Sequence, residues 1–586
     1  MKRTHSATEL TVDHAGQEVI LNGWVDTRRD HGGLIFIDLR DRSGIIQIVF
    51  SPEVCEEAFH LAEQVRSEYV IAVRGEVRRR PEATENPNLK TGLIEVYARQ
   101  MEVFSPAKTP PFYIEDGIDV DETLRLRYRY LDLRRPEMRD CIMLRHRVVQ
   151  TMRSFLDQRG FIEIETPILT KSSPEGARDY LVPSRVHPGE FFALPQSPQI
   201  FKQILMVAGM EKYFQIARCF RDEDLRADRQ PEFTQLDMEM SFVDEEDIFA
   251  LVEDLMAVIF KEGPGRDIAT PFPRITYDEA MLKYGSDKPD MRFGLEIVEL
   301  TDLVRDVDFK VFSSAVQAGG VVRAINAKGC ATFTRREIDE LTQIAVDNGA
   351  KGMAWIMVTE NELRSPITKF FSEEQMNRVL QALDTKPGDL LLFSADTEAT
   401  VARVLGTIRL ELGKRLNLID DSKLSFVWVT DFPLLEWDEE EKRYVAVHHM
   451  FTSPRVKDIP QLEENPLHAR SRAYDLILNG TEIGGGSIRI HRRDWQEKMF
   501  KLVGLTPEEA YDKFGYMLDA FEYGTPPHGG IAFGVDRLVM IMAGRSSIRD
   551  VIAFPKTQSA SCLLTQAPSP VSPKQLRELS LKVREK

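Results

Sequence analysis

The chain has 586 residues, of which 42% are hydrophobic and 29% charged, and its net charge is −17. This length exceeds what one hydrophobic core supports, so several domains are expected, and the composition is typical of a soluble globular protein. No apolar run reaches the roughly 18 residues of a membrane span. The five cysteines are scattered, odd in number and without metal-ligand spacing, and the N-terminus lacks an apolar segment. These features predict a reducing, cytoplasmic setting.

Residues 1–105 predict five short strands, with one helix between the third and the fourth. The first strand is predicted to end at Val25, and residues 28–33 are predicted to form a loop before the second. This order is typical of an OB-fold, whose open face binds single-stranded nucleic acid. The acidic net charge argues against such a partner, but arginines gather in this part of the chain, and local clustering decides binding. Phe36 is a candidate for base stacking, although core packing is the alternative. Gln47 can read a base edge, and Arg29 can hold a phosphate or a base.

Three later stretches concentrate polar chemistry. In 161–178 a strand leads to Pro167 and then a loop. In 214–242 two strands flank a charged turn, and alternation puts Asp237 and Glu239 on one face of the second strand. In 524–538 a glycine-rich strand precedes a helix, with an arginine at their junction. A lone charged hairpin is usually a solvated surface, but three such stretches together indicate a charged ligand.

These stretches resemble the three signature motifs of class II aminoacyl-tRNA synthetases. Motif 1 ends at Pro167, motif 2 carries Phe220-Arg221-Asp222-Glu223, and motif 3 carries Gly534-Val535-Asp536-Arg537. The words FKQ, GSDKPD, GGGSIRIH and YGTPPHGG are similar to those of the bacterial-type aspartyl-tRNA synthetases, and the likeness covers nearly the whole chain. It implies a multidomain α+β fold, with an N-terminal OB-fold β-barrel and an antiparallel-sheet catalytic domain that contains an inserted α/β domain.

The resemblance implies six segments. They are 1–105, an OB-fold anticodon-binding domain; 106–140, a hinge; 141–286, the catalytic domain with motifs 1 and 2; 287–420, the bacterial-type insertion; 421–556, the catalytic domain continued, with motif 3; and 557–586, a C-terminal extension.

The implied reaction has two steps, in which aspartate attacks the α-phosphate of ATP and a terminal ribose hydroxyl of tRNA then takes the aspartyl group. Such chemistry needs alignment and cations where negative charge builds. Arg221 is the candidate for the α-phosphate and Arg537 for the γ-phosphate, and these two form the catalytic set. Asp475 and Glu482 are candidate Mg²⁺ ligands, because hard cations take carboxylate oxygens. The ATP-binding set is Arg221, Asp222, Glu223, Gln230, Glu482, Gly534, Val535, Asp536 and Arg537.

A pocket for aspartate must bind groups of both charges. The side-chain carboxylate of aspartate needs cations, and the α-ammonium group needs a hydrogen-bond acceptor. The aspartate-binding set that the resemblance implies is Glu175, Ser197, Gln199, Lys202, Arg221, Asp237, His448 and Arg489. Lys202 and Arg489 are assigned to the side-chain carboxylate. The pair His448-His449 could be read as metal ligands, but neighbouring residues of an extended segment point to opposite faces. The resemblance implies instead that His448 closes over aspartate, although Met450 follows where the family usually has proline.

The anticodon set implied by the resemblance is Arg29, His31, Phe36 and Gln47. Relatives restricted to the aspartate tRNA tend to have leucine at the position of His31, whereas imidazole can donate, accept or stack and so tolerate more than one base. Charging of both tRNA(Asp) and tRNA(Asn) is therefore expected, with strict tRNA(Asp) specificity or a solvated His31 as the alternatives. Motif 1 implies a homodimer, and its alternative is a buried helix and strand without a partner.

Two other functions compete with tRNA charging. An amide-forming ligase that acts on free aspartate would use the same catalytic fold, but it needs no anticodon-binding module. A non-catalytic binding protein with this fold predicts substitutions in the site. Such a protein would have substitutions at Arg221, Glu482, Arg489 or Arg537, and all four residues are intact.

Overall fold

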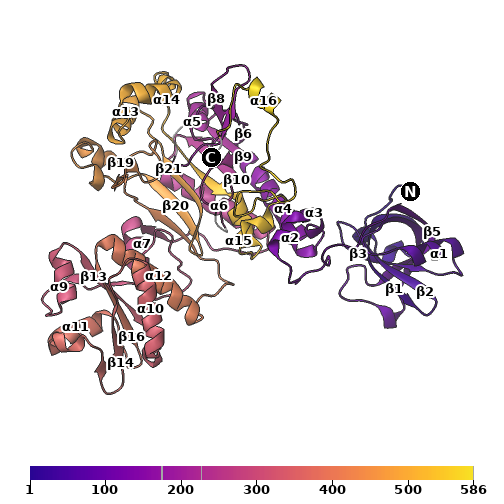
Figure 1. The fold of residues 1–586 in the computed structure, drawn as a ribbon, viewed down its shortest axis with the longest axis horizontal. Coiled ribbons are helices and arrows are strands. Elements are labelled where there is room, and N and C mark those ends of the chain that lie inside the picture. The colour runs from indigo at the N-terminus through magenta and orange to yellow at the C-terminus, as the bar shows by residue number, and fades with distance from the viewer. Residues whose placement is uncertain (173–175, 226–227, 585–586) are drawn as a thin grey trace. The chain divides into compact units, whose positions relative to one another are not determined.

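The structure is a computed structural model that describes residues 1–172, 176–225 and 228–584. It divides into two compact units, Met1–Arg139 and Asp140–Lys586. The division falls within helix α4 (Pro136–Asp157). Figure 1 shows the elements of each unit along the chain.

The first unit contains a closed five-stranded barrel in the order β1-β2-β3-β5-β4. Side chains alternate along its strands, so that Ile35, Ile37 and Leu39 of β2 are buried while Phe36 between them is half-buried. Alternation therefore turns Phe36 away from the core of the barrel. The elements of this unit are β1 (Glu18–His31), β2 (Leu34–Arg40), β3 (Ile45–Phe50), α1 (Glu56–Gln64), β4 (Val70–Arg79), β5 (Ile94–Ser105), α2 (Glu122–Arg127) and α3 (Arg129–Asp132).

The first hairpin is longer than the sequence predicts. We expected the first strand to end at Val25 and residues 28–33 to form a loop. In the structure β1 pairs with β2 as far as His31, opposite Leu34. Only two glycines remain between the strands, both with positive φ, which is the conformation that tight two-residue hairpin turns require. The charged run before His31 hides this extension, because exposed strand ends carry no apolar alternation.

The second unit is built on an eight-stranded sheet that is antiparallel except at its two ends. One face packs against α4, α6 (Glu245–Glu262) and α15 (Val535–Met542) in the largest apolar core. Leu236, Met238 and Met240 point into this core, so alternation turns Asp237 and Glu239 to the other face. In order across the sheet, the strands are β11 (Arg274–Thr276), β17 (Phe426–Thr430), β20 (Ala473–Leu478), β21 (Thr481–Ile488), β22 (His528–Gly534), β10 (Glu232–Ser241), β9 (Lys212–Phe220) and β6 (Ile162–Glu163).

The motif 1 strand is shorter than expected. The sequence predicts a strand that runs to Pro167, but β6 has two residues and pairs only with β9 at the edge of the sheet. An edge strand has one neighbour, so few residues of the extended segment find ladder partners.

A second, five-stranded sheet lies between β11 and β17 in the chain, in the order β12-β13-β16-β14-β15. Neighbouring residues of β13 and β16 point into two separate apolar clusters, one with α10 and α12 and the other with α8, α9 and α11. The helices therefore cover both faces of this sheet (Figure 1). Its elements are β12 (Val298–Glu299), α8 (Thr301–Val304), α9 (Lys310–Gln317), β13 (Val321–Ala327), α10 (Arg335–Asp347), β14 (Ala354–Val358), β15 (Leu363–Arg364), α11 (Glu373–Ala382), β16 (Leu390–Asp396) and α12 (Glu398–Arg415).

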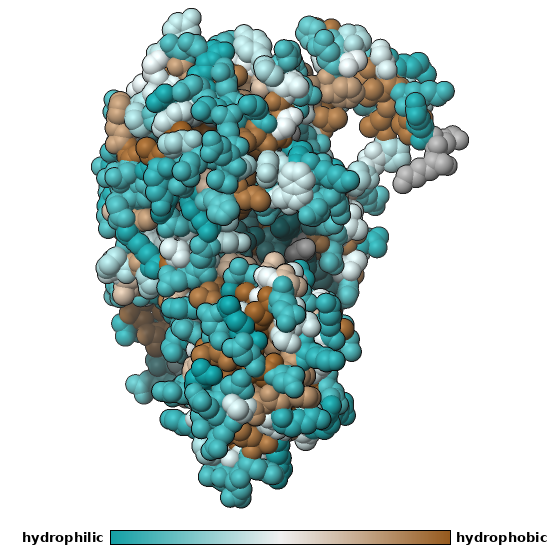
Figure 2. All heavy atoms as spheres, turned by 90° about the vertical axis from the view of Figure 1, so that its left-hand side faces the viewer, coloured by the Kyte–Doolittle hydropathy of each residue, from teal (hydrophilic) through white to brown (hydrophobic). Residues whose placement is uncertain are grey.

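The remaining elements of the second unit are β7 (Leu181–Pro183), β8 (Phe191–Ala193), α5 (Gln199–Val207), α7 (Tyr277–Tyr284), β18 (Leu435–Asp438), β19 (Arg443–Ala446), α13 (Arg493–Leu502), α14 (Pro507–Phe521) and α16 (Pro573–Glu578). Figure 2 shows a face on which hydrophilic side chains predominate and apolar ones form separate patches. Among the described residues, no helix combines the length and the apolarity that crossing a membrane would require.

Candidate active site

A buried group of charges occupies the polar face of β10. Lys202 reaches this face from helix α5 and donates from Nζ to Asp237 Oδ1 over 2.6 Å. The same ammonium lies 3.2 Å from Glu239 Oε2. None of these three side chains is more than 2% exposed. Burial of charges is costly unless they are paired, so this arrangement is a built site rather than a solvated surface.

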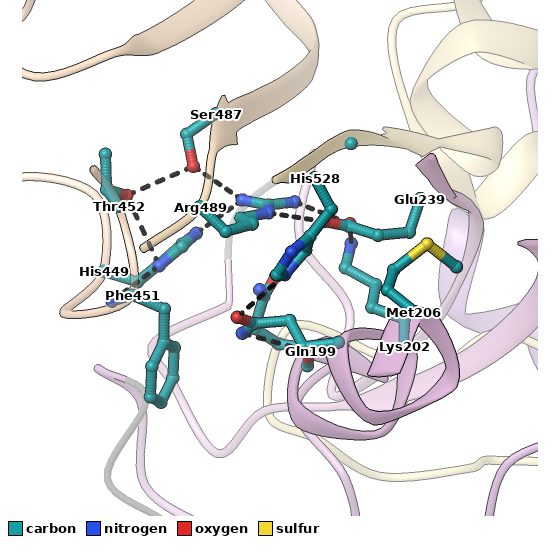
Figure 3. Close-up of polar contacts among 12 residues, drawn as sticks. Gln199, Lys202, Met206, Glu239, His449, Phe451, Thr452, Ser487, Arg489 and His528 are labelled. Atoms are coloured by element: carbon teal, nitrogen blue, oxygen red, sulfur yellow. Dashed lines mark hydrogen bonds and ion pairs between the residues drawn. The ribbon is translucent and has the colours of Figure 1, made fainter. Parts of the chain in front are cut away.

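Arg489 lies directly after β21 and completes this group. Its Nε and Nη2 donate to the two carboxylate oxygens of Glu239 over 2.9 and 3.1 Å. Its Nη1 donates to Ser487 Oγ over 2.7 Å and lies 2.8 Å from His449 Nε2. Figure 3 shows the guanidinium between Glu239 on one side and Ser487 and His449 on the other. Four contacts on one rigid fork fix its orientation.

Each cation keeps bonding capacity for a ligand. An arginine has five N–H donors and a lysine three. Within the described part of the chain, four contacts engage Arg489 and two carboxylates engage Lys202. One N–H of Arg489 Nη2 and at least one N–H of Lys202 are therefore left. Two such donors match the two oxygens of an incoming carboxylate.

The two acidic residues of the pocket differ in electrostatics. Burial would raise the pKa of Glu239, but Arg489 and Lys202 lower it to about 2. Burial raises the pKa of Asp237, against the opposing pull of Lys202. Asp237 Oδ2 is buried and has no hydrogen-bond partner among the described residues. This oxygen is available as an acceptor for an ammonium group.

The two adjacent histidines contact different groups, in a segment that bends at His448 rather than continuing as a strand. The Nδ1 atom of His448 lies 3.9 Å from Asp475 Oδ1, and its ring meets Phe432 edge to face at 4.6 Å. His449 instead touches Arg489. Burial lowers the pKa of His448 to about 4 and that of His449 well below its ordinary value. Both rings are therefore neutral at physiological pH.

A third buried histidine, His528 on β22, gives a prediction for unfolding. Burial lowers its pKa to about 4, whereas an unfolded histidine titrates near about 6.5. Between these values the unfolded chain binds a proton that the folded chain does not, so this contribution to stability is lost as pH falls from about 6.5 towards 4. During urea unfolding at a pH of about 5.5, His528→Gln is expected to take up about one proton fewer than wild type. Equal uptake in a pH-stat would show that His528 is already protonated in the folded chain.

A second acidic site lies on β20 and β21. The Oδ1 atom of Asp475 is buried without a hydrogen-bond partner in the described residues. A Cβ on Gly485 would lie 2.6 Å from this atom and 3.6 Å from Glu482 Oε1, so the glycine leaves room where the two carboxylates converge. Burial and the charge of Glu482 raise the pKa of Asp475 well above its ordinary value. Two converging carboxylates, one of which has an unpartnered buried oxygen, fit a hard divalent cation.

The two predicted catalytic arginines each lie shortly after a strand of the eight-stranded sheet, Arg221 after β9 and Arg537 after β22. Arg221 follows β9, its guanidinium lies 5.2 Å from the centre of the Phe233 ring, and its buried Nε lacks a hydrogen-bond partner among the described residues. Arg537 is in the first turn of α15. It donates to the backbone carbonyl of Glu482 over 2.5 Å and pairs with Asp228 at 3.1 Å. Both therefore keep donor capacity that a phosphate can use.

Other members of the predicted ATP set are engaged in supporting contacts. Both ends of the Gln230 amide bond to the backbone of Lys556, over 3.0 and 2.7 Å. Asp536 is buried and accepts from Arg145 and from the backbone of Thr234. At the start of α15, Gly534 is the N-cap residue and Val535 is buried. In motif 2, Glu223 pairs with Arg229 at 3.0 Å, and the backbone N–H of Asp222 donates to the carbonyl oxygen of Arg178.

The predicted aspartate set is brought together in part. Ser197 Oγ accepts from the backbone of Gln199 over 3.3 Å at the start of α5, and the buried Nε2 atom of Gln199 has no partner among the described residues. Both residues precede Lys202 on the same short segment. Glu175 lies outside the described residues.

The first unit carries a separate polar cluster on its barrel. Arg29 of β1 donates to Gln47 Oε1 of β3 over 3.4 Å, and Gln47 Nε2 donates to Glu95 over 2.8 Å. Half-buried Phe36 lies opposite Arg29 in the strand register. His31 is exposed at the end of β1. Aromatic, amide and guanidinium groups on one open face are suited to unpaired bases.

Sequence reasoning left four residues of these sites unassigned. Glu239 was placed on the correct face but given no role, although its strand position two residues after Asp237 is a sufficient signal. Lys288 lies in the motif GSDKPD, which also received no role. His449 and Ser487 could not be found from the sequence, because their function depends on side-chain contacts with Arg489, which lies 40 and two positions away from them.

Both parts of the chain match families of known proteins. Residues 121–558 match the family model described as tRNA synthetases class II (D, K and N), and residues 19–104 match the model of the OB-fold nucleic acid binding domain. The aspartate–tRNA(Asp/Asn) ligase of Syntrophomonas wolfei is 74% identical over 586 residues, with all of both chains covered. The ligase of the same name from Heliobacterium modesticaldum is 65% identical and covers 100% of this chain and 96% of its own.

A solved structure gives the same fold. The asparaginyl-tRNA synthetase of Pyrococcus horikoshii with asparaginyl-adenylate aligns with a TM-score of 0.60 at 20% identity. The alignment covers 95% of this chain and 98% of that chain.

Proposed function

Because the chain belongs to the class II tRNA synthetases of the D, K and N group, we propose that it activates L-aspartate with ATP and transfers it to tRNA. The relatives named aspartate–tRNA(Asp/Asn) ligase support tRNA(Asp) and tRNA(Asn) as the acceptors. The observation that carries the proposal is the pair of buried cations, Lys202 and Arg489, which face one pocket with unused N–H groups. An amide-forming ligase is disfavoured, because it would not need the OB-fold domain.

The pocket selects aspartate by charge. The remaining donors of Lys202 and Arg489 would take the side-chain carboxylate, and Asp237 Oδ2 would accept from the α-ammonium. Asparagine would turn an uncharged amide toward both cations and leave them uncompensated. Such a polar mismatch in a buried site discriminates more strongly than shape alone.

The first chemical step is the attack of the aspartate α-carboxylate on the α-phosphorus of ATP, with pyrophosphate leaving. Arg221 is proposed to hold the α-phosphate and Arg537 the γ-phosphate, so that nucleophile and leaving group are aligned. Aspartate-dependent exchange of labelled pyrophosphate into ATP tests this step. Pyrophosphate exchange that is as fast with asparagine as with aspartate would refute the proposed selectivity.

Asp475 and Glu482 are the proposed ligands of Mg²⁺, which supplies charge neutralisation to the phosphates when bound. Their fit is the unpartnered buried oxygen of Asp475 beside the open space at Gly485. No group of three or more His, Cys, Asp or Glu side chains in the described residues could hold a metal alone. The phosphates would have to complete the coordination, as is usual for this ion.

Selection between the two tRNAs is proposed to depend on His31 at the tip of the first hairpin. Wild type is expected to charge transcripts of both tRNAs, because an exposed imidazole can hydrogen-bond to more than one base. His31→Leu should suppress charging of the asparagine transcript selectively, while Phe36→Ala should weaken both. If wild type charges the asparagine transcript about a thousandfold less efficiently than the aspartate transcript, roughly 4 kcal/mol, the prediction that it charges both tRNAs is wrong.

We also propose that the protein is a homodimer formed through motif 1, since two-fold dimers are the commonest oligomers of soluble proteins. Its expected localisation is the cytoplasm, where its proposed substrates occur.

A further inference from the structure

The segment Gly285–Asp290, with the sequence GSDKPD, links α7 to the inserted domain and has no role in the site described so far. It begins at Gly285, which ends α7 with a φ of 67°. Two of its charged residues, Asp287 and Lys288, lie together, with Lys288 Nζ 3.1 Å from Asp287 Oδ2.

Helix α12 of the inserted domain holds the segment at its start. A Cβ on Gly285 would lie 2.2 Å from the carbonyl oxygen of Ala402, and one on Gly406 would lie 2.7 Å from the carbonyl oxygen of Gly285. Ala402 and Gly406 are both on α12. The two backbones therefore approach each other more closely than any pair of larger residues would allow.

The same helix also holds the end of the segment. Arg409 of α12 is 1% exposed, and its Nη2 donates to the carbonyl oxygens of Asp290 and Phe293 over 2.8 Å each. Its guanidinium also lies over the rings of Tyr284 and Phe293, at 4.9 and 4.1 Å from their centres. With both ends held by α12, the position of the residues between them is fixed by the inserted domain.

Between these anchors, Lys288 reaches the second acidic site. Its Nζ lies 3.5 Å from Glu482 Oε2. Arg537, the residue proposed for the γ-phosphate, donates to the backbone carbonyl of the same Glu482. The Lys288 side chain is 40% exposed, so a ligand can reach it from solvent.

The charges at this place are unbalanced. Two carboxylates, those of Asp287 and Glu482, lie 3.1 and 3.5 Å from the single ammonium of Lys288. A polyphosphate that approaches them is repelled unless cations face it. A lysine on a flexible stem is a common point-charge partner of phosphate.

We propose that Lys288 binds the phosphates of ATP beside Glu482 and that helix α12 of the inserted domain holds it there. This inference rests on the proposed function for its ligand. It gives the inserted domain a role in the catalytic centre, that of positioning a cation through the segment 285–290.

The test is calorimetric binding of ATP with Mg²⁺, without aspartate or tRNA. Lys288→Met is expected to raise the Kd of ATP by about tenfold or more, and Lys288→Arg by much less, because the positive charge is kept. Lys283→Met is the matched control, since this lysine is exposed on α7 and pairs only with Glu279 in the described residues. If Lys288→Met binds ATP as tightly as wild type, or more tightly, Lys288 only offsets the carboxylates and the proposal is wrong.

The anchoring by α12 is tested on the helix itself. Gly406→Val should displace the segment and weaken ATP binding as Lys288→Met does, with aspartate binding unchanged. If that variant fails to fold, Arg409→Met serves, because it removes the nitrogen that donates to the carbonyls of Asp290 and Phe293. Leu410→Ala, on the exposed side of α12, is the control. Normal ATP binding in a folded Gly406→Val or Arg409→Met protein would overturn the anchoring.

The proposed function and this inference fail separately. A wild-type protein that binds ATP in a Lys288-dependent manner but supports no aspartate-dependent exchange refutes aspartate activation and leaves the inference standing. A wild-type protein that activates aspartate while Lys288→Met binds ATP normally refutes the inference alone.

Discussion

Replacing Arg489 by leucine is expected to raise the KM for aspartate on the order of a hundredfold, with little change in the KM for ATP. The guanidinium neutralises Glu239 and keeps one N–H for the substrate. Leucine provides neither, so the buried Glu239 carboxylate would repel the carboxylate of the substrate. Breaking a buried ion pair on one side typically costs about 3–5 kcal/mol. Steady-state pyrophosphate exchange, with each substrate varied in turn, measures both KM values.

Two variants sharpen this prediction. Arg489→Lys keeps the charge but loses the four-contact fork, so an intermediate effect is expected. Arg492→Leu removes an exposed arginine paired with Asp494 and should behave like wild type. Equal rises in the KM values for aspartate and ATP in a folded Arg489→Leu enzyme would mean that Arg489 supports the site as a whole rather than the amino acid.

Replacing Arg221 by alanine is expected to lower the rate of pyrophosphate exchange by about 10²–10³-fold, equivalent to about 2.7–4 kcal/mol. The reason is the loss of a preorganised donor where negative charge develops on the α-phosphate. The effect should appear in kcat more than in KM, because the interaction strengthens in the transition state.

The matched control for Arg221 is Arg218→Ala, three residues earlier on β9. Arg218 is 43% exposed and pairs with Glu232, so its removal should leave exchange near the wild-type rate. If Arg221→Ala also exchanges pyrophosphate near the wild-type rate, the assignment of this arginine to the α-phosphate is wrong.

Much of the fold could be predicted from local patterns. Alternation on β10 identified the face that carries Asp237 and Glu239, and the glycine-rich run before Arg537 indicated a strand followed by a helix. The ends of exposed elements were less accessible. The extension of β1 to His31 and the shortness of β6 depend on which backbone groups find partners, and residue types do not reveal this.

The site was predicted as a set of residue types, but not as a network. Lys202 and Arg489 were identified as cations for a carboxylate, but the sequence did not indicate that Glu239 already holds both. The contact of His449 with Arg489 could not be predicted either, because the sequence alone does not show which of two adjacent histidines contacts the arginine. The contacts of Arg489 with Glu239 and with His449 join residues 250 and 40 positions apart, and they follow from packing of the whole sheet.

Transfer of labelled aspartate to RNA is the most direct measurement of what this protein does. Wild type is incubated with ATP, Mg²⁺, labelled aspartate and separate transcripts of tRNA(Asp) and tRNA(Asn), with Arg221→Ala as the inactive control. Acid-precipitable label on both transcripts is the expected result, with far less label from the variant. A folded wild-type protein that leaves both transcripts unlabelled would contradict the proposed function.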